Sequence, residues 1–374
     1  ALPWAQGVYP PFGLRCNLGL LISNLGIPAR SRNNITHVTI FQIGSKLTSS
    51  DTKKFPCWVL TPGHAGMENQ AIALAETVGL PFTVKRVHPR PPWTWLPPGW
   101  WPSPLTALGV DSDSISPPWP DLVISCGRGA VPYALLAKKR SNGATMAVHI
   151  QNPKTRLAAF DLVAPPRHDH LQGPNVIETE ASLHSITNQR LTEAANQFAP
   201  SLSHLPRPLV AVLIGGSNAC FRLTPQIMTT FTGQLRKLCR DLGVGLVVTP
   251  SRRTGDENIQ ALHQALEGLP AQVWDFEGDN PYFGYLGLAD SIIVTCDSVN
   301  MVTEACATGK PVHVVHLDGG NRKFKEFHGS MQAAGYTRPF QGHLEHWRYR
   351  PANDTAKVAR RIHELLRKKS PTPA

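Results

Sequence analysis

Acidic residues are scarce in this chain relative to basic ones. The 374 residues include 37 Lys plus Arg but only 26 Asp plus Glu, which leaves a formal net charge of +11. No acidic residue precedes Asp51. An excess of positive charge favours an anionic partner, and phosphates, nucleic acid and an acidic membrane surface all satisfy that condition. Charge alone therefore does not identify the partner.

Long apolar runs are also absent. A membrane-spanning helix needs roughly 18 or more consecutive apolar residues, and no segment of the sequence provides them. The composition, 41% hydrophobic and 17% charged, is typical of a globular protein, and 374 residues suit two domains of ordinary size. We expect a cytoplasmic protein that is at most peripheral, at the inner face of a membrane.

Several common ligand motifs are missing. The seven cysteines form no C-x-x-C pair and have no spacing typical of a zinc site, so we expect reduced and mostly buried thiols. The histidine pairs 168/170, 313/316 and 343/346 are too scattered to indicate a metal. Neither G-x-G-x-x-G nor G-x-x-x-x-G-K-[ST] occurs, which removes the usual support for a dinucleotide oxidoreductase or a P-loop NTPase. We predict no metal and no cofactor.

Residues 1–54 differ in composition from the rest of the chain and allow three interpretations. The apolar stretch 18–27 is interrupted by Asn and Ser, which makes it a poor secretory signal, and the acid-poor composition fits an organelle transit peptide weakly. The simplest hypothesis is an unstructured extension ahead of a folded start at Phe55.

From Phe55 onward, short apolar runs alternate with amphipathic segments. The strands predicted in the first half are 57–61, 82–87, 121–125, 145–150, 161–164 and 175–179. The predicted helices are 69–78, closed by Gly79, and 130–139. A polar helix and the sequence SLSHLPRP then occupy 188–208 and read as an interdomain linker. Alternation of β-rich runs with helices indicates a parallel sheet that is covered on both faces.

The second half repeats this plan. Its predicted elements are strand 209–214, helix 224–241, strand 245–249, helix 257–266, strand 272–275, a strand–turn–helix–strand segment at 289–315, and a final helix at 354–367. The fold class is therefore α/β, with two Rossmann-like doubly wound parallel-sheet domains that face a cleft. We place an extension at 1–54, an acceptor-side domain at 55–205, a nucleotide-binding domain at 206–350, and a C-terminal helix and tail at 351–374.

In doubly wound sheets, ligands bind beyond the carboxyl ends of the strands, so the turns at those ends are the candidate site. After strand 209–214, Gly215 and Gly216 would let the backbone approach a bound group, and Ser217 and Asn218 could cap the following helix or donate to an oxyanion. A plain strand-to-helix turn is the alternative. The turn after strand 245–249, with Ser251, Arg252, Arg253 and Thr254, puts two guanidinium groups where a diphosphate or carboxylate would sit. The alternative is a solvated basic turn.

The segment 289–315 carries the strongest nucleotide signal. Thr295, Asp297 and Ser298 end a buried strand and open a helix whose N-terminal N–H groups would face a phosphate. Glu304 on that helix could accept both hydroxyls of a ribose. The alternative is that Asp297 or Ser298 only caps the helix and Glu304 is solvated. Before it, GDNPY forms a turn whose Asn280 and Tyr282 could line a base or sugar pocket, or be a turn and nothing else.

Candidate catalytic groups come from the first half. Gly63, His64, Gly66 and Gln70 belong to a flexible loop that leads into a helix, and His64 could act as an acid or base near neutral pH. His184 lies before the linker, and His168 and Asp169 follow strand 161–164; all three could face the cleft. For each histidine, an ordinary structural or solvated role is the competing interpretation.

A loop at 89–104 contains Trp93, Trp95, Trp100 and Trp101 among many prolines and follows several cations. Aromatic residues beside cations suit a membrane interface or a lipid-linked acceptor. Packing of these tryptophans on their own domain is the alternative.

Six segments together resemble the family named after the plant elongated-mitochondria fission factor, and the resemblance covers about residues 55–350. They are CWVLTPGHAGMENQAIALAETVGLP, APPRHDHLQGPNVIET, LIGGSN, TPSRRT, GDNPYFGYLGLADSIIVTCDSVNMVTEACATGKPV and KFKEFH. More remotely, the layout is similar to the two-domain glycosyltransferase fold of the enzyme that adds N-acetylglucosamine to lipid-linked peptidoglycan precursors, and of lipid A disaccharide synthase.

This second resemblance implies a nucleoside diphosphate sugar in the C-terminal domain. Gly215, Gly216 and Ser217 would meet the diphosphate, Asp297 and Ser298 would hold phosphate or sugar, and Glu304 would bind ribose. The sequence TCDSVNMVTE departs from those transferases because it lacks their Gly-rich turn. The residues leave two main hypotheses: transfer of a sugar to a hydrophobic or membrane-linked acceptor, with His64 or His184 as base, or a non-catalytic protein that keeps the scaffold and binds a membrane or partner. Nucleic-acid binding is a weaker third, and we expect none.

Overall fold

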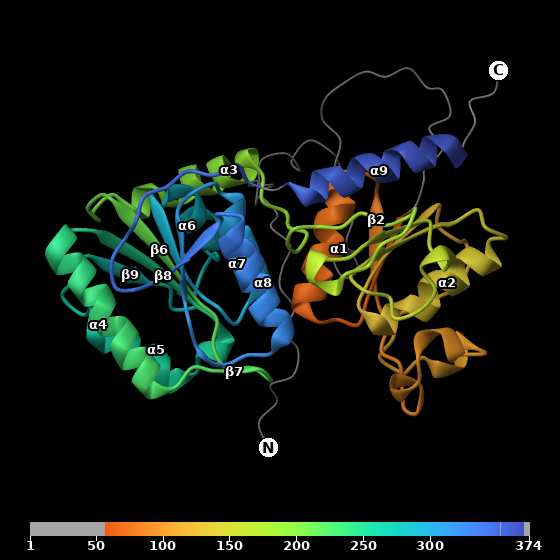
Figure 1. Ribbon diagram of the computed structural model, residues 1–374, viewed down its shortest axis with the longest axis horizontal. Helices are drawn as coiled ribbons and strands as arrows, with labels where there is room; N and C mark the ends of the chain where they lie inside the picture. Colours follow the sequence, from red (N-terminus) through yellow and green to blue (C-terminus); the bar gives the residue numbers. More distant parts are fainter. Residues whose placement is uncertain (1–56, 352, 370–374) are drawn as a thin grey trace, which may run out of the picture. The chain divides into compact units, whose positions relative to one another are not determined.

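The computed structural model describes residues 57–351 and 353–369 (Figure 1). Two parallel sheets form the framework, and their central strands are short apolar runs. The first sheet contains strands β1 (Cys57–Thr61), β2 (Phe82–Arg86), β3 (Leu122–Cys126), β4 (Met146–Ile150) and β5 (Leu162–Ala164). Their order across the sheet is β2-β1-β3-β4-β5, and every pair is parallel.

Side chains alternate between the two faces of the first sheet, as the pleat of a strand requires. Cys57 and Val59 of β1 join the core under helices α1 (Ala65–Val78) and α9 (Asp354–Lys369). Trp58 and Leu60 join the core under α2 (Val131–Arg140). The last helix of the chain therefore returns to the first sheet, where it lies beside α1 (Figure 1).

The second sheet is built from strands of the other half. They are β6 (Leu209–Ile214), β8 (Gly245–Pro250), β9 (Ala271–Val273), β10 (Ser291–Thr295), β11 (Val312–Val315) and β13 (Thr337–Pro339). Its helices are α4 (Pro225–Leu242), α5 (Asp256–Leu266), α6 (Tyr282–Leu288), α7 (Val299–Ala307) and α8 (Arg322–Ala333). A separate two-stranded ribbon pairs β7 (Phe221–Arg222) with β12 (Asp318–Gly319).

The order of this sheet is β13-β11-β10-β6-β8-β9. Counted along the chain, this is the strand order of the dinucleotide-binding fold, in which the chain reverses its direction of travel between the first and fourth strands. The reversal falls between β6 and β10, which pair in parallel. The turns after these two strands are therefore the expected ligand position.

The prediction of two parallel-sheet α/β domains is confirmed, and most predicted elements match within a few residues. The exceptions are informative. Residues 175–179 make only two isolated bridges, to Val163 and Pro166, and no strand. The polar helix predicted at the start of the linker is present as α3 (Asn188–Phe198), but it packs on α6. Helix α6 was not predicted, and it begins at Tyr282, the last residue of the predicted turn GDNPY.

The boundaries of the predicted domains stay a prediction, and residues 1–54 lie outside the described residues. In the part of the chain that the structure describes, no helix is long and apolar enough to cross a membrane. The six cysteines within that part are free thiols.

Candidate functional site

The turns after β6 and β10 meet at the reversal point of the second sheet. Gly215 and Gly216 follow β6, and residues 296–298 follow β10. The N–H of Gly215 donates to the hydroxyl oxygen of Thr295 at 2.8 Å. The two turns predicted to bind one ligand are thus in direct contact.

Asp297 holds these turns together. Its carboxylate accepts from the N–H of Gly216 at 3.1 Å and from the hydroxyl of Thr295 at 2.7 Å. The guanidinium of Arg253, from the turn after β8, pairs with the same carboxylate at 2.8 Å, and the Asp297 side chain has no exposed surface. A buried carboxylate with an ion pair and two further donors is well compensated, so Asp297 fixes three turns relative to one another.

The two glycines are required by this close packing. A Cβ atom on Gly215 would collide with the carboxylate of Asp297, and one on Gly216 would collide with the carbonyl of Arg253. Gly216 also has a φ of 140°, a backbone conformation that favours glycine. Glycine is needed at both positions because neighbouring turns of the same chain pack directly against them. Sequence alone does not reveal this reason.

Ser217 and Asn218 do not cap the next helix, contrary to one of the predicted roles. Helix α4 begins after Thr224, whose side chain accepts from the N–H of Ile227. The Ser217 hydroxyl instead accepts from the N–H of Leu223, and the Asn218 side-chain oxygen accepts from the N–H groups of residues 220 and 221. Both side chains shape the turn through β7, a strand that the sequence pattern did not reveal.

The turn after β8 forms a short 3-10 helix, η9 (Arg252–Thr254). The Ser251 hydroxyl donates to the carbonyl of Gly215, and its oxygen also receives the N–H of Arg253. Arg252 and Arg253 are both exposed, but part of the Arg253 charge is committed to Asp297. This turn therefore offers less positive charge to a phosphate than the sequence predicts, because Arg253 is paired with Asp297.

Helix α7 begins as predicted, with Ser298 as its N-cap and the Ser298 hydroxyl accepting from the N–H of Met301. Further along the helix, the phenol of Tyr282 donates to the Glu304 carboxylate at 2.6 Å. Burial raises the pKa of Glu304 from 4.5 to about 7, although the hydrogen bond from Tyr282 opposes the change. Glu304 is not a solvated surface acid, which removes the competing interpretation for this residue.

Asn280 lies just before Tyr282, and its side-chain oxygen accepts from the N–H of that residue at 3.0 Å. It therefore stabilises the start of α6 and, with it, the position of the tyrosine. Burial also raises the pKa of Tyr282 well above its usual value, so its phenol stays a donor. Asn280, Tyr282 and Glu304 form one connected group.

The start of α1 contacts the start of α7. Gly66 and Gln70, which were predicted to lie in a flexible loop, belong to α1. Gln70 donates to the side-chain oxygen of Asn300 at 3.2 Å, and Asn300 donates to the carbonyl of Gly66 at 3.1 Å. His64 is exposed at the N-terminus of α1 and makes no side-chain cap bond, and Gly63 precedes it with a φ of 80°. The predicted loop from the first half and the predicted helix from the second are thus neighbours.

Asp169 and His184 lie elsewhere. Asp169 pairs with Lys323 of α8 at 2.6 Å, and its neighbour His168 packs edge-on against Phe327. Asp169 and His184 thus contact different parts of the second half. The catalytic roles of His64, Asp169 and His184 stay predictions.

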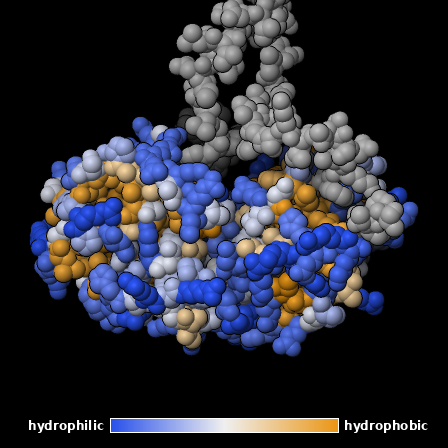
Figure 2. Space-filling view, turned by 90° about the horizontal axis from the view of Figure 1, so that it is seen from above, coloured by the Kyte–Doolittle hydropathy of each residue, from blue (hydrophilic) through white to orange (hydrophobic). Residues whose placement is uncertain are grey.

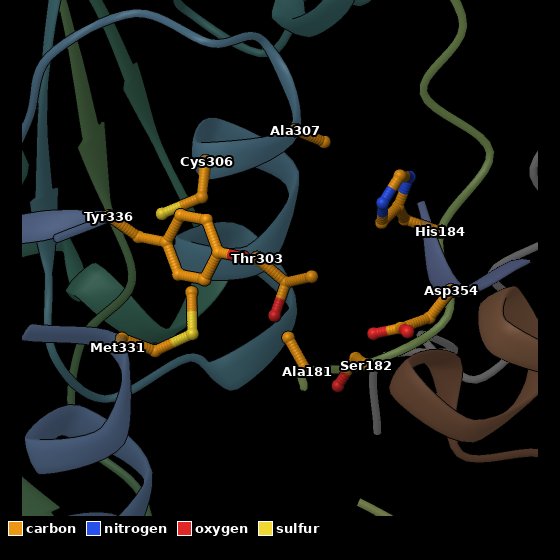
Figure 3. A pocket seen from close by; sticks show the side chains of 9 residues that line it. All are labelled: Ala181, Ser182, His184, Thr303, Cys306, Ala307, Met331, Tyr336 and Asp354. Atoms are coloured by element: carbon orange, nitrogen blue, oxygen red, sulfur yellow. The ribbon is translucent and has the colours of Figure 1, made fainter. Parts of the chain in front are cut away.

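His184 is buried and lines a small cavity. It lies with Asp354 on one side, across from Thr303, Cys306 and Tyr336 (Figure 3). The Nδ1 atom of His184 accepts from the N–H of Ile186 at 3.3 Å. A general base needs access to an acceptor hydroxyl, and this surrounding favours a structural role for His184.

Three residues near the site were given no role from the sequence. Asn300 bridges to the first half, Lys323 pairs with Asp169, and the Nε2–H of His328 donates to the carbonyl of Cys296 at 2.8 Å. Burial lowers the pKa of His328, so the ring stays neutral at physiological pH. Lys323 and His328 belong to the motif KFKEFH, but only the tertiary structure shows what they contact. No group of three or more potential metal ligands occurs among the residues described.

Residues 65–366 match the protein family described as Mitochondrial fission ELM1. The chain belongs to this family. It is 32% identical over 274 residues to the mitochondrial fission protein ELM1 of Arabidopsis thaliana, a match that covers 66% of this chain and 64% of the plant protein. The chain thus matches less than two thirds of the length of that family member. An uncharacterised protein of Rickettsia prowazekii is 26% identical over 288 residues, covering 66% of this chain and 80% of its own length.

The chain is also similar to solved structures at low sequence identity. The UDP-GlcNAc 2-epimerase of Methanocaldococcus jannaschii aligns over 83% of this chain and 99% of its own, with a TM-score of 0.52 and 10% identity. MurG of Acinetobacter baumannii aligns over 84% and 92%, with a TM-score of 0.44 and 15% identity. This family member therefore has the GT-B fold of two parallel-sheet domains, a likeness that concerns the fold alone.

Proposed function

We propose that the second half of the protein binds a nucleoside diphosphate sugar at the reversal point between β6 and β10. The observation that carries this proposal is the meeting, at that point, of the 215–218 turn with the start of α7. Ligands of doubly wound sheets bind at such points, and the N–H groups at a helix start favour phosphate. The name of the epimerase with the same fold specifies a nucleoside diphosphate sugar, which supports the same ligand class.

Two further features support this choice of ligand. Glu304, two turns into α7, offers a carboxylate that a ribose diol could engage, and Tyr282 beside it supplies an aromatic ring near the base or sugar. Arg252 is exposed on the adjoining turn, where a guanidinium would stabilise a diphosphate. In this proposal Asp297 does not touch the ligand but orders the turns that do.

The proposed reaction is transfer of the sugar to a hydrophobic or membrane-linked acceptor held beside the loop after β1. The acceptor hydroxyl would attack the anomeric carbon as the bond from that carbon to the diphosphate oxygen breaks. The proton would pass to a base, for which the exposed His64 is better placed than the buried His184. The departing diphosphate would be stabilised by the α7 N–H groups and Arg252.

One observation favours a second candidate function, a non-catalytic member of the family that keeps the nucleotide-sugar scaffold and acts by binding a membrane or partner. His184 is buried, and Asp169 is committed to an ion pair with Lys323, so neither of these candidate catalytic residues is placed as an accessible base. Nucleotide binding is common to both candidates, whereas turnover belongs only to the first.

The test is a panel of nucleoside diphosphate sugars, scored by thermal stabilisation and by slow hydrolysis of the donor. We expect stabilisation for at least one base, and we expect Glu304→Ala to abolish it while the fold remains intact by circular dichroism. Stabilisation without hydrolysis or transfer would select the non-catalytic candidate. A panel that gives neither effect would refute the nucleotide site.

A further inference from the structure

The segment between β2 and β3 presents large apolar side chains to solvent. The side chains of Trp95 and Trp100 are 75% and 74% exposed, and Leu105 is 40% exposed. They lie on or beside three short 3-10 helices, η2 (Trp93–Trp95), η3 (Pro98–Trp100) and η4 (Pro104–Ala107). Two indoles this exposed lose much of the favourable free energy that burial would give them, so their exposure needs an explanation.

The segment is held in place by its other tryptophans. Trp101 is buried, and its ring packs against Tyr133 of α2 and against Trp93, with centroids 6.1 Å and 5.9 Å away. Its indole N–H donates to the carbonyl of Leu96, which also accepts from Arg128 at 2.7 Å. Packing on their own domain therefore explains Trp101 but not Trp95 and Trp100, which are largely exposed.

The surroundings of the exposed indoles are cationic. No acidic residue occurs between positions 87 and 110, a stretch that contains Arg90. Gly99 abuts Thr155, so the exposed cations on either side of that threonine, Lys154 and Arg156, flank the 98–100 turn.

The next acids along the chain are Asp111 and Asp113. The Asp113 carboxylate is turned back to β2, where it accepts from the backbone N–H of Arg86. Exposed indoles beside cations are complementary to an anionic lipid surface.

Exposure of apolar groups is not by itself unusual here, because apolar side chains reach the surface at several places (Figure 2). The other exposed large apolar residues each lie beside an acidic residue. Val110 precedes Asp111, Leu242 follows Asp241, and Phe276 lies between Asp275 and Glu277. Leu242 and Phe276, which are 53% and 38% exposed, serve as controls in a different charge setting.

We propose that Trp95, Trp100 and Leu105 dock the protein on the surface of an anionic lipid bilayer. The position of the segment fits a lipid-borne acceptor, because it starts at the carboxyl end of β2. There His88 abuts Gly63 of the predicted acceptor loop, and Pro89 abuts Gly129 after β3. Only this link to the acceptor rests on the proposed function, whereas docking on lipid does not require a nucleotide.

The test uses the full 374-residue chain and vesicles of phosphatidylcholine with 0 or about 30 mol% phosphatidylglycerol. The double variant Trp95→Ser with Trp100→Ser should lower the vesicle partition coefficient about tenfold or more, because burial of part of an indole is worth that factor. Phe276→Ser should leave partitioning unchanged. Replacing both Lys154 and Arg156 by Glu should weaken binding to the anionic vesicles alone.

Brominated lipids give a direct readout. They should quench part of the tryptophan emission of the wild-type chain, and this quenching should be lost in the double variant, with folding checked by circular dichroism. If the double variant does not fold, quenching in Trp100→Ser alone decides the question. Wild-type protein that fails to bind anionic vesicles, or a double variant that binds as well as wild type, would overturn the proposal. Nucleotide stabilisation is measured without vesicles, so the two proposals can fail separately.

Discussion

Replacing Glu304 by Gln should make the protein more stable at pH 8 and worse at binding a nucleotide. The carboxyl of Glu304 has a pKa raised from 4.5 to about 7 by burial. Ionising this group in the folded protein is therefore unfavourable relative to the unfolded chain. Gln has nearly the same shape, and its amide oxygen can still accept the hydrogen bond from Tyr282.

The sign of the pH dependence comes from proton binding. Between pH 4.5 and about 7 the folded protein holds the Glu304 proton more tightly than the unfolded chain does, so stability falls as pH rises through this window. A pKa rise of that size lowers the free energy of unfolding by about 3 kcal/mol above pH 7. Because the side chain retains some contact with solvent, we expect Glu304→Gln to gain about 1–3 kcal/mol at pH 8. The gain should vanish below about pH 4.5, where both variants are neutral.

Urea unfolding at pH 4.5, 6 and 8 measures this effect, and Glu267→Gln, at an exposed position, is the matched control. Nucleotide affinity, measured by calorimetry, should fall about tenfold or more in Glu304→Gln, since the variant loses charge-assisted hydrogen bonds to ribose. Wild-type affinity should rise with pH up to about 7, as the carboxylate forms. A variant that is no more stable at pH 8 than at pH 4.5, relative to wild type, would refute the account of Glu304.

Two other changes test the framework of the site. Asp297→Asn should lower the free energy of unfolding by about 2–4 kcal/mol, because the buried carboxylate loses its charge-assisted bonds and leaves Arg253 unpaired; wild-type stability would show that Asp297 does not join the three turns. Ile362→Ala should lower it by about 2–5 kcal/mol, because this residue of α9 is fully buried against the first sheet, whereas Arg361→Ala on the same helix should have a small effect. Equal effects of the last two substitutions would mean that α9 contributes little to that core.

The central strands could be predicted well because they are buried on both faces. Runs such as LVAVLI in β6 are continuous and apolar, which is the pattern of parallel strands covered by helices. Residues 175–179 (NVIET) also contain β-branched residues but find a backbone partner at only two positions. Composition does not show whether a neighbouring strand is present.

Two helices were missed for different reasons. Helix α6 contains two glycines and is a poor helix by propensity, but Gly284 abuts Phe198 and Gly287 abuts the carbonyl of Leu191, so contact with α3 maintains it. Helix α8 was not predicted, although the spacing of Phe324, Phe327 and Met331 is typical of one face of a helix.

The candidate site, too, could be predicted only in part. Turns at the ends of predicted strands could be placed at one edge of the sheet from topology, and they do meet there. The ion pair between Asp297 and Arg253 could not be predicted, because these residues are far apart in the chain and meet only after folding. The pairing of Tyr282 with Glu304 has the same origin, since neither residue is special by local pattern.

The return of α9 to the first sheet makes that domain discontinuous in the chain. The second sheet, with strands from β6 to β13, is inserted between two parts that share one core. Val358 and Ile362 leave the ribosome long after the last strand of the sheet they cover, β5 (Leu162–Ala164). The first sheet is thus synthesised early but cannot complete its core until nearly the whole described chain is available, whereas all strands of the inserted sheet are made before that moment. A fragment that stops short of α9 would expose the apolar face of α1, and we expect such fragments to aggregate.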